Sequence, residues 1–146
     1  MYKSRNEFIE ACLSSNILFH AGATAAPGSG PTNCTFEDVY ICNYIQDLTD
    51  NFNWTRQSGS TSSSNTGPSS DHTYGTSAGH YMYIEASSPA RPGQLARLFI
   101  PKYPAVNQDQ CLQFYYHMYG SQIGKLNVKV GVGMSNEVFN LGQILV

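Results

Sequence analysis

The most regular feature of this chain is an alternation of apolar and polar positions with a period of two, which is typical of half-buried β-strands. It occurs in the segments 81–86, 111–119 and 125–132. The segment 94–101 is apolar on both faces, as the interior of a sandwich permits. A glycine-containing turn separates 111–119 from 125–132, so we expect these two strands to form a hairpin.

Turns and loops, rather than long helices, connect the alternating segments. A weak amphipathic pattern allows a short helix at 6–12, but the stretch 1–32 ends in a Gly/Pro/Ala linker and indicates a flexible lead-in or a non-native N-terminus. The polar stretch 58–70 predicts an exposed loop, and the prolines in 87–93 predict a turn. Short strands joined by such turns favour an all-β sandwich or barrel.

Large side chains supply the expected core. Phe52 lies beside Trp54, the single tryptophan, and large aromatic residues dominate core burial. Phe114 and Met118 fall on one face of the segment 111–119. We therefore expect these four residues to anchor the core.

The tyrosines and histidines allow two interpretations each. Many of the ten tyrosines could form an outward aromatic face for carbohydrate or protein, or could pack in the core and a second layer. His72 and His80 flank a glycine-rich turn, where they could bind metal or sense pH. Two histidines without softer ligands make a poor transition-metal site, so capping or packing of the loop is the alternative. The tyrosines in question are Tyr74, Tyr81, Tyr83, Tyr115, Tyr116 and Tyr119.

Length and charge limit the function classes. At 146 residues the chain suits one domain with a core of its own. Only 12% of its residues are charged and its formal net charge is −2, so it lacks the basic surface that binds nucleic acid or an anionic membrane. It also has no run of about 18 apolar residues, and we expect no membrane-spanning segment.

The chain has four cysteines, which indicate disulfides and an oxidising compartment. Cys34 and Cys42 are eight positions apart, a spacing that suits a local disulfide, although sequence alone does not fix the connectivity. Metal binding is the rival interpretation, but no second pair stands at ligand spacing. The other two cysteines are Cys12 and Cys111.

Two Asn-X-Thr sequons, which begin at Asn33 and Asn53, are glycosylation acceptors and also indicate secretion. The N-terminal stretch contains no convincing signal peptide, because acidic residues interrupt its start and its apolar part is short. The expected location is extracellular, in a secreted protein or the ectodomain of a membrane protein.

The sequence contains no arrangement suited to catalysis. Ser70, Asp71 and His72 are consecutive, so their side chains diverge and are no evidence for a triad. Cys111 and His117 share a strand face, but about 20 Å separates them at roughly 3.3 Å per residue. No metalloprotease helix, phosphate loop or dinucleotide fingerprint is present. We expect no enzyme activity and no catalytic residue.

Acidic residues in the first half allow a structural calcium ion, which takes six to eight oxygen ligands. The candidate ligands are Glu37, Asp50 and Asp71, and Asp38 and Asp47 lie nearby in the sequence. The alternative is that all of them are solvated carboxylates in turns, because no single loop supplies a known ligand spacing.

Four long strings carry a resemblance: NCTFEDVYIC, DNFNWTRQSGSTSSSNTGPSSDHT, TGPSSDHTYGTSAGHYMYIEA and CLQFYYHMYGSQIGKLNV. In content, order and spacing they resemble the MAM domain, the extracellular module of meprins, neuropilins and the receptor phosphatase mu group. The resemblance covers about residues 33–130. It implies an antiparallel β-sandwich of jelly-roll type and a disulfide between the family's first two cysteines, which correspond to Cys34 and Cys42. Some members also carry a structural cation.

The tail 131–146 departs from the family pattern, because it lacks a tryptophan-bearing turn, an acidic pair and a last cysteine. Cys111 then lacks its family partner, and we expect a free thiol unless Cys12 or another molecule captures it. The expected organisation is a lead-in at 1–32, a partial MAM-like domain at 33–130 and a divergent tail, with the C-terminal strands of the sandwich missing.

The resemblance implies a non-catalytic extracellular module for protein interaction or cell adhesion, as a fragment of a larger membrane or secreted protein. Its partners would be other cell-surface or secreted proteins, with self-association as one form, and neither nucleic acid nor direct membrane insertion is expected. The alternative is an accessory assembly domain of a secreted metalloprotease, which an H-E-x-x-H segment elsewhere in the same transcript would favour. No cofactor is expected apart from the calcium ion.

Overall fold

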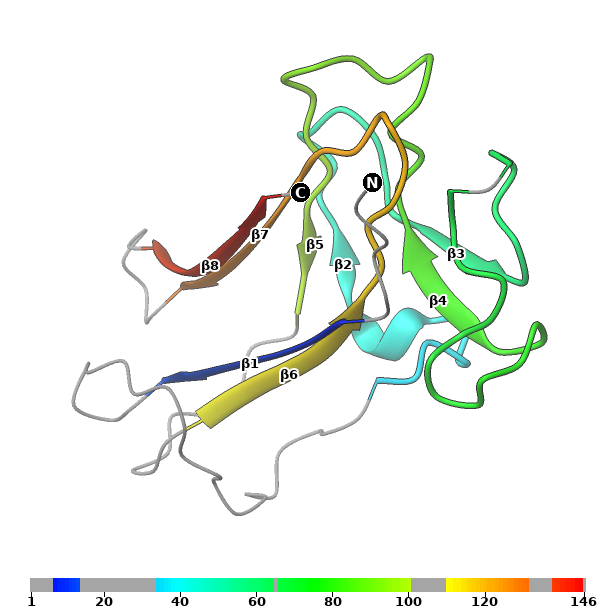
Figure 1. Cartoon of the computed structure of the whole chain (residues 1–146). Helices are drawn as coiled ribbons and strands as arrows, with labels where there is room; N and C mark the ends of the chain where they lie inside the picture. The colour runs from blue at the N-terminus through cyan, green and yellow to red at the C-terminus, as the bar shows by residue number, and fades with distance from the viewer. Residues whose placement is uncertain (1–6, 14–33, 65, 101–109, 132–137, 146) are drawn as a thin grey trace.

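The structure, a computed structural model, describes residues 7–13, 34–64, 66–100, 110–131 and 138–145 (Figure 1). These ranges contain strands and one short 3-10 turn, η1 (Ile41–Asn43), but no α-helix, which agrees with the expected all-β class. No helix within them has the length and apolar character needed to cross a bilayer. The strands are β1 (Glu7–Leu13), β2 (Ile45–Gln46), β3 (Thr55–Ser58), β4 (His80–Tyr83), β5 (Leu98–Phe99), β6 (Gln110–Tyr116), β7 (Lys125–Gly131) and β8 (Val138–Leu145).

The strands form small antiparallel sheets of two strands each: β1 with β6, β2 with β5, β3 with β4, and β7 with β8. Figure 1 shows the paired arrows side by side. This arrangement supports the coarse class, an antiparallel all-β protein. The finer expectation of a jelly-roll sandwich remains a proposal.

The expected hairpin between 111–119 and 125–132 is wrong. β6 pairs with β1, from Glu7 opposite Tyr116 to Leu13 opposite Gln110, and β7 pairs with β8. Alternation with a period of two identifies a strand and its faces, but it does not identify the partner strand. The expected helix at 6–12 is also wrong, because so short a helix is marginal in water and β6 supplies a ladder of backbone partners instead.

β4 and β5 are shorter than the segments predicted as strands. β4 ends before residue 86, because the Glu85 carboxylate forms a local turn by accepting hydrogen bonds from the Ser87 N–H at 3.1 Å and its hydroxyl at 2.6 Å. β5 contains two residues. The residues before it, 95–97, bond instead to the turn 47–51, so their backbone groups are used outside a regular ladder.

Strands also occur in the segments expected to be a lead-in and a tail. β1 lies within 1–32 and pairs with β6 along its whole length. β8 lies within 131–146 and pairs with β7, with a register shift between Val128 and Lys129. Both terminal segments therefore contribute to sheets, and the rest of 1–32 lies outside the described residues.

In the ranges 34–64, 66–100 and 111–129 no hydrophobic side chain is fully buried. The four expected core anchors are half-buried: Phe52, Trp54, Phe114 and Met118. A hydrogen bond adds to the packing of the tryptophan, because the indole N–H of Trp54 donates to the Ala96 carbonyl at 3.1 Å. The single buried polar side chain in these ranges is Asp71, which is 2% exposed and belongs to a loop.

Candidate functional site

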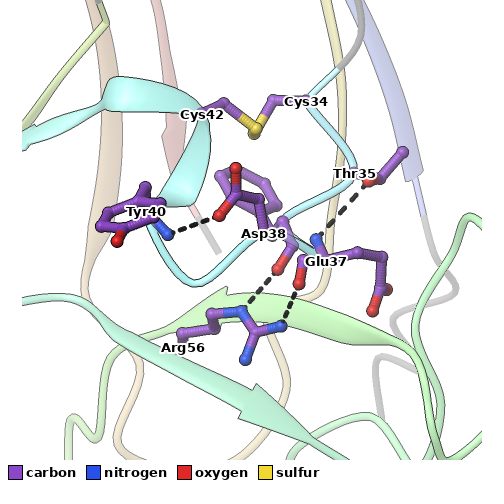
Figure 2. The surroundings of a disulfide bond; sticks show 8 residues. Cys34, Thr35, Glu37, Asp38, Tyr40, Cys42 and Arg56 are labelled. Carbon is purple, nitrogen blue, oxygen red and sulfur yellow. Dashed lines mark hydrogen bonds between the residues drawn. A yellow bond between two sulfur atoms is a disulfide. The ribbon is translucent and has the colours of Figure 1, made fainter.

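A disulfide between Cys34 and Cys42 closes the loop that precedes η1 (Figure 2). This confirms the expected pairing. Within the loop and η1, Phe36, Ile41, Cys42 and Asn43 adopt left-handed backbone angles, with φ between 46° and 61°. Such angles are rare for residues other than glycine, and least favourable for a β-branched residue such as isoleucine. The surrounding contacts therefore have to hold this backbone in place.

Arg56 on β3 supplies the first of these contacts. Its guanidinium donates from Nε to the Phe36 carbonyl at 2.6 Å and from Nη2 to the Glu37 carbonyl at 2.5 Å (Figure 2). The acceptors are two consecutive backbone carbonyls, and the planar fork of arginine fits such a pair. The disulfide-closed loop is therefore fixed to β3.

Glu37 supplies the second contact, to the start of β4. Its carboxylate accepts the His80 backbone N–H at 2.7 Å and lies 2.7 Å from His80 Nδ1. The backbone N–H of His80, followed by its imidazole, holds the pKa of Glu37 below its ordinary value. The loop is thus bound to both strands of the β3–β4 sheet.

The outer part of the same loop presents two large side chains. The Asp38 carboxylate accepts the Tyr40 N–H at 2.9 Å and forms a local turn (Figure 2). Val39 is 73% exposed and Tyr40 is 75% exposed. The loop therefore combines a fixed base with an exposed apolar tip.

The β2–β5 sheet carries further exposed apolar side chains. Ile45 lies opposite Phe99 in the ladder, and both are exposed. Leu48, 91% exposed, lies in the turn 47–51, which Arg97 holds through an ion pair with Asp47 at 2.6 Å. We group the exposed apolar residues of these segments with those of the loop tip and call the group the apolar surface. Its members are Val39, Tyr40, Ile45, Leu48, Leu95, Phe99 and Ile100.

A second loop is organised around Asp71. Its carboxylate accepts the Tyr74 N–H at 2.7 Å and the Thr76 N–H at 3.1 Å, and these bonds, that of Tyr74 first, hold the pKa of Asp71 below its ordinary value. A Cβ at Gly79 would overlap this carboxylate, so glycine is needed there. The loop leaves His72 and Tyr74 exposed.

The loop around Asp71 reaches β6 through an aromatic contact. The His72 ring stacks on the Tyr115 ring, with centroids 3.2 Å apart and planes inclined by 20°. Of the two interpretations of His72, loop packing is the one that the structure favours. Tyr74, Tyr115 and Tyr119 are exposed, whereas Tyr81, Tyr83 and Tyr116 are half-buried, so the tyrosines divide between surface and packing.

The three candidate calcium ligands are each engaged by N–H donors of a different partner. Glu37 accepts from His80, Asp71 from Tyr74 and Thr76, and Asp50 from the Arg97 N–H. In the ranges that the structure describes, no three His, Cys, Asp or Glu side chains are arranged to hold a metal ion. These residues do not fit a shared cation site as they stand, and the calcium ion stays a prediction.

The residues weighed for catalysis have separate structural roles. His72 stacks on Tyr115, His80 contacts Glu37, and His117 Nε2 lies 3.0 Å from the Thr66 carbonyl oxygen.

Cys111 is disulfide-bonded, so the expectation of a free thiol at this position is wrong. In the β1–β6 ladder the residue opposite Cys111 is Cys12. The sequence names Cys12 as an alternative partner of Cys111, but it does not place the two cysteines opposite each other, because it predicts a short helix or a flexible lead-in around Cys12.

Sequence reasoning also missed Arg56, Gly79 and Gln46. The Gln46 side chain accepts the Trp54 N–H at 3.0 Å and donates to the Trp54 carbonyl at 2.7 Å, and so joins β2 to the segment before β3. A single arginine, glycine or glutamine has no pattern around it that marks such a role.

The described residues form an antiparallel β protein with a disulfide-closed loop, and comparison with known proteins gives its family. The family model described as MAM domain, meprin/A5/mu, matches residues 34–142. The chain belongs to the MAM domain family. The match extends past residue 130, where the resemblance seen in the sequence ends, and includes β7 and part of β8.

Several curated relatives carry such a domain. The chain is 46% identical over 122 residues to human MAM domain-containing glycosylphosphatidylinositol anchor protein 1, covering 81% of this chain and 13% of that protein. It is 46% identical over 112 residues to protein 2 of the same name from mouse, covering 68% of this chain and 12% of that protein. Human MAM domain-containing protein 2 is 45% identical over 98 residues, which are 67% of this chain and 14% of that protein. No solved structure matches the chain.

The chain thus spans only about an eighth of the length of these relatives, 12% to 14%. Two of the relatives are named as glycosylphosphatidylinositol anchor proteins, which is consistent with a cell-surface or extracellular location.

Proposed function

We propose that this chain is a non-catalytic extracellular module for protein interaction or cell adhesion, part of a larger membrane or secreted protein, with the jelly-roll sandwich as its fold. The observation that carries the proposal is the apolar surface. In the part of the chain whose burial is described, seven of the ten exposed large hydrophobic residues belong to the segments 39–48 and 95–100, which the β2–β5 ladder joins. Clustered exposed apolar side chains are typical of sites where proteins bind one another.

The loop tip has the features of a binding hot spot. Tyrosine is among the residues that contribute most at interfaces, and a side chain on a rigid backbone loses less freedom on binding. The disulfide and Arg56 fix the base of the loop, whereas Val39 and Tyr40 remain exposed. The partner would be a cell-surface or secreted protein with an apolar contact surface, and a second copy of the chain is one form of it.

The low charge of the chain supports contact rather than long-range attraction. With 12% charged residues and a net charge of −2, electrostatic steering of a partner is weak. Binding should therefore depend little on ionic strength, because apolar contacts are not screened by salt.

The test uses the oxidised chain, secreted from mammalian cells and coupled to fluorescent beads. Bead-to-bead aggregation measures self-association, and bead binding to cultured cells, before and after surface proteolysis, measures binding to other proteins. We expect Val39→Ser with Tyr40→Ser to weaken the observed binding about tenfold or more, as hot-spot truncation does. Tyr74→Ser, an exposed tyrosine of the other loop, is the matched control and should retain binding.

The two possible failures are distinct. If wild-type beads neither aggregate nor bind cells, the proposed interaction function is wrong. If wild-type beads bind and the double variant binds equally well, the function stands and the assignment of the apolar surface is wrong.

A further inference from the structure

The loop that follows β3 is rich in hydroxyl side chains. Its described parts, 58–64 and 66–70, consist mainly of serine and threonine and contain Pro68. Segments of this composition are a common place for O-linked sugars in secreted proteins. Composition alone does not select among the hydroxyl groups, but the conformation of the loop divides them into two sets.

The first set makes hydrogen bonds within the protein. The Ser63 hydroxyl donates to the Glu85 carboxylate at 2.6 Å, and this bond is the main cause that holds the pKa of Glu85 below its ordinary value. The hydroxyls of Thr61 and Thr66 both donate to the Ser63 carbonyl, at 3.4 and 3.1 Å. All three hydroxyl-bearing residues of this set, Thr61, Ser63 and Thr66, are half-buried.

The second set is exposed to solvent and consists of Ser60, Ser64 and Ser69. From Ser60 to Ser64 exposed and half-buried residues alternate, so each exposed serine adjoins an inner residue that is half-buried. The three exposed serines line one recess of about 380 Å³, together with inner residues of the loop. They therefore lie near one another on the surface.

Two contacts hold the loop in this conformation. The Ser63 hydroxyl attaches it to Glu85, which follows β4. The Thr66 carbonyl oxygen lies 3.0 Å from Nε2 of His117, which follows β6. Because both contacts join segments that are distant in the sequence, the division of the hydroxyl groups is a property of the folded protein.

We propose that the exposed serines Ser60, Ser64 and Ser69 are acceptors for an O-linked N-acetylhexosamine in the secreted protein, and that the hydroxyls of Thr61, Ser63 and Thr66 stay unmodified. In the transfer, a serine hydroxyl oxygen bonds to the anomeric carbon of a sugar that is activated as a nucleoside diphosphate. The bond from that carbon to the diphosphate oxygen breaks, the nucleoside diphosphate leaves and the hydroxyl loses its proton. A transferase that meets the folded chain reaches the exposed hydroxyl groups, whereas the inner ones are engaged.

The site lies apart from the strands of the apolar surface. Figure 1 shows the loop at the right edge, beyond β3, and β2 and β5 nearer the middle. The inference goes beyond the proposed function and shares with it only the secretory route, which a heterologous signal peptide supplies in the test. A chain without sugar on this loop can still bind a partner, and a chain that binds no partner can still carry the sugar, so the two proposals fail separately.

The first measurement is mass spectrometry of the full chain secreted from mammalian cells, with N-linked glycans removed and electron-transfer fragmentation to locate the remaining sugars. We expect N-acetylhexosamine on one or more of Ser60, Ser64 and Ser69, and an almost complete loss of sugar from the loop in the triple variant Ser60→Ala, Ser64→Ala, Ser69→Ala. The matched control is Thr73→Ala with Ser77→Ala, two exposed residues of the next loop, which should keep the sugar. A wild-type loop without sugar overturns the proposal.

The second measurement tests whether the fold selects the acceptors. A purified polypeptide N-acetylgalactosaminyltransferase and its nucleotide sugar are added to the native chain and, separately, to the chain after reduction, alkylation and unfolding. We expect modification of the exposed serines in the native chain, and additional modification of Thr61 and Thr66 once unfolding breaks their hydrogen bonds. The same sites in both samples, or sugar on Thr61 or Thr66 in the native chain, would overturn the role of the fold.

Discussion

Gly79 and Asp71 share one small space in the loop before β4. A Cβ at position 79 would overlap the Asp71 carboxylate, which is held by the N–H groups of Tyr74 and Thr76. We expect Gly79→Ala to lower the free energy of unfolding by about 1–3 kcal/mol, as overpacking does. Urea denaturation measures the change. The matched control is Gly124→Ala, because nothing lies within 4 Å of a Cβ there. Equal stability of the two variants would contradict this account of the loop.

Glu37 links the stability of the protein to pH. Its pKa lies below its ordinary value of 4.5, mainly because of the His80 backbone N–H. The unfolded chain therefore binds the proton more readily, so the stabilisation is present above about pH 4.5 and is lost as the pH falls through the folded-state pKa. We expect Glu37→Gln to be less stable than wild type at neutral pH and the difference to shrink in acid. Denaturation curves across the pH range measure this, and a constant difference would rule it out.

The sequence identifies Glu37 and Asp71 as noteworthy carboxylates but not their partners. The sequence suggests that these carboxylates bind a cation, whereas in the structure each carboxylate accepts hydrogen bonds from backbone N–H groups. The donor to Glu37 is His80, 43 positions away, and no local pattern predicts so distant a contact. The contact of Arg56 with its two carbonyl acceptors is not predicted from the sequence for the same reason.

At the scale of elements, the disulfide-closed loop has a measurable effect on stability. Loop closure over this separation of eight residues contributes roughly 2–3 kcal/mol by reducing the freedom of the unfolded chain. We expect Cys34→Ser with Cys42→Ser to lose about that much, seen as a lower melting midpoint and an unchanged strand signal in circular dichroism. An unchanged melting midpoint would mean that the disulfide does not stabilise the protein by restricting the unfolded chain.

The β1–β6 ladder makes a second prediction about cysteine. Cys111 is disulfide-bonded and lies opposite Cys12 in the register, and Cys34 and Cys42 bond to each other. We expect mass spectrometry of a non-reduced digest to yield a linked peptide that contains Cys12 and Cys111. A thiol at Cys111 that reacts with an alkylating reagent in the native, oxidised chain would contradict the prediction.

Strand positions follow from the sequence more readily than strand partners. The alternation in 111–119 locates β6 to within a few residues. Its partner β1 lies about a hundred positions earlier, in a segment whose weak amphipathic pattern allows a short helix within a flexible lead-in. Pairing is set by which backbones meet in the folded chain, and the period of a single segment does not contain that information.

For the molecule as a whole, sequence predicts the class and the family but not the arrangement of sheets. Low charge, turn-rich composition and four cysteines indicate an extracellular β protein, and the long strings identify the MAM resemblance. The division into four two-stranded sheets depends on long-range pairings that these properties do not specify.

The two attachments of the disulfide-closed loop differ in what can release them. The attachment to β3 joins the Arg56 guanidinium to two neutral backbone carbonyls and involves no carboxylate. The attachment to β4 is strongest with an ionised Glu37, so it weakens when that carboxylate takes a proton in acid. On acidification the loop would therefore remain attached to β3 while its contact with β4 weakens, and the base that carries Val39 and Tyr40 would be held mainly from the β3 side.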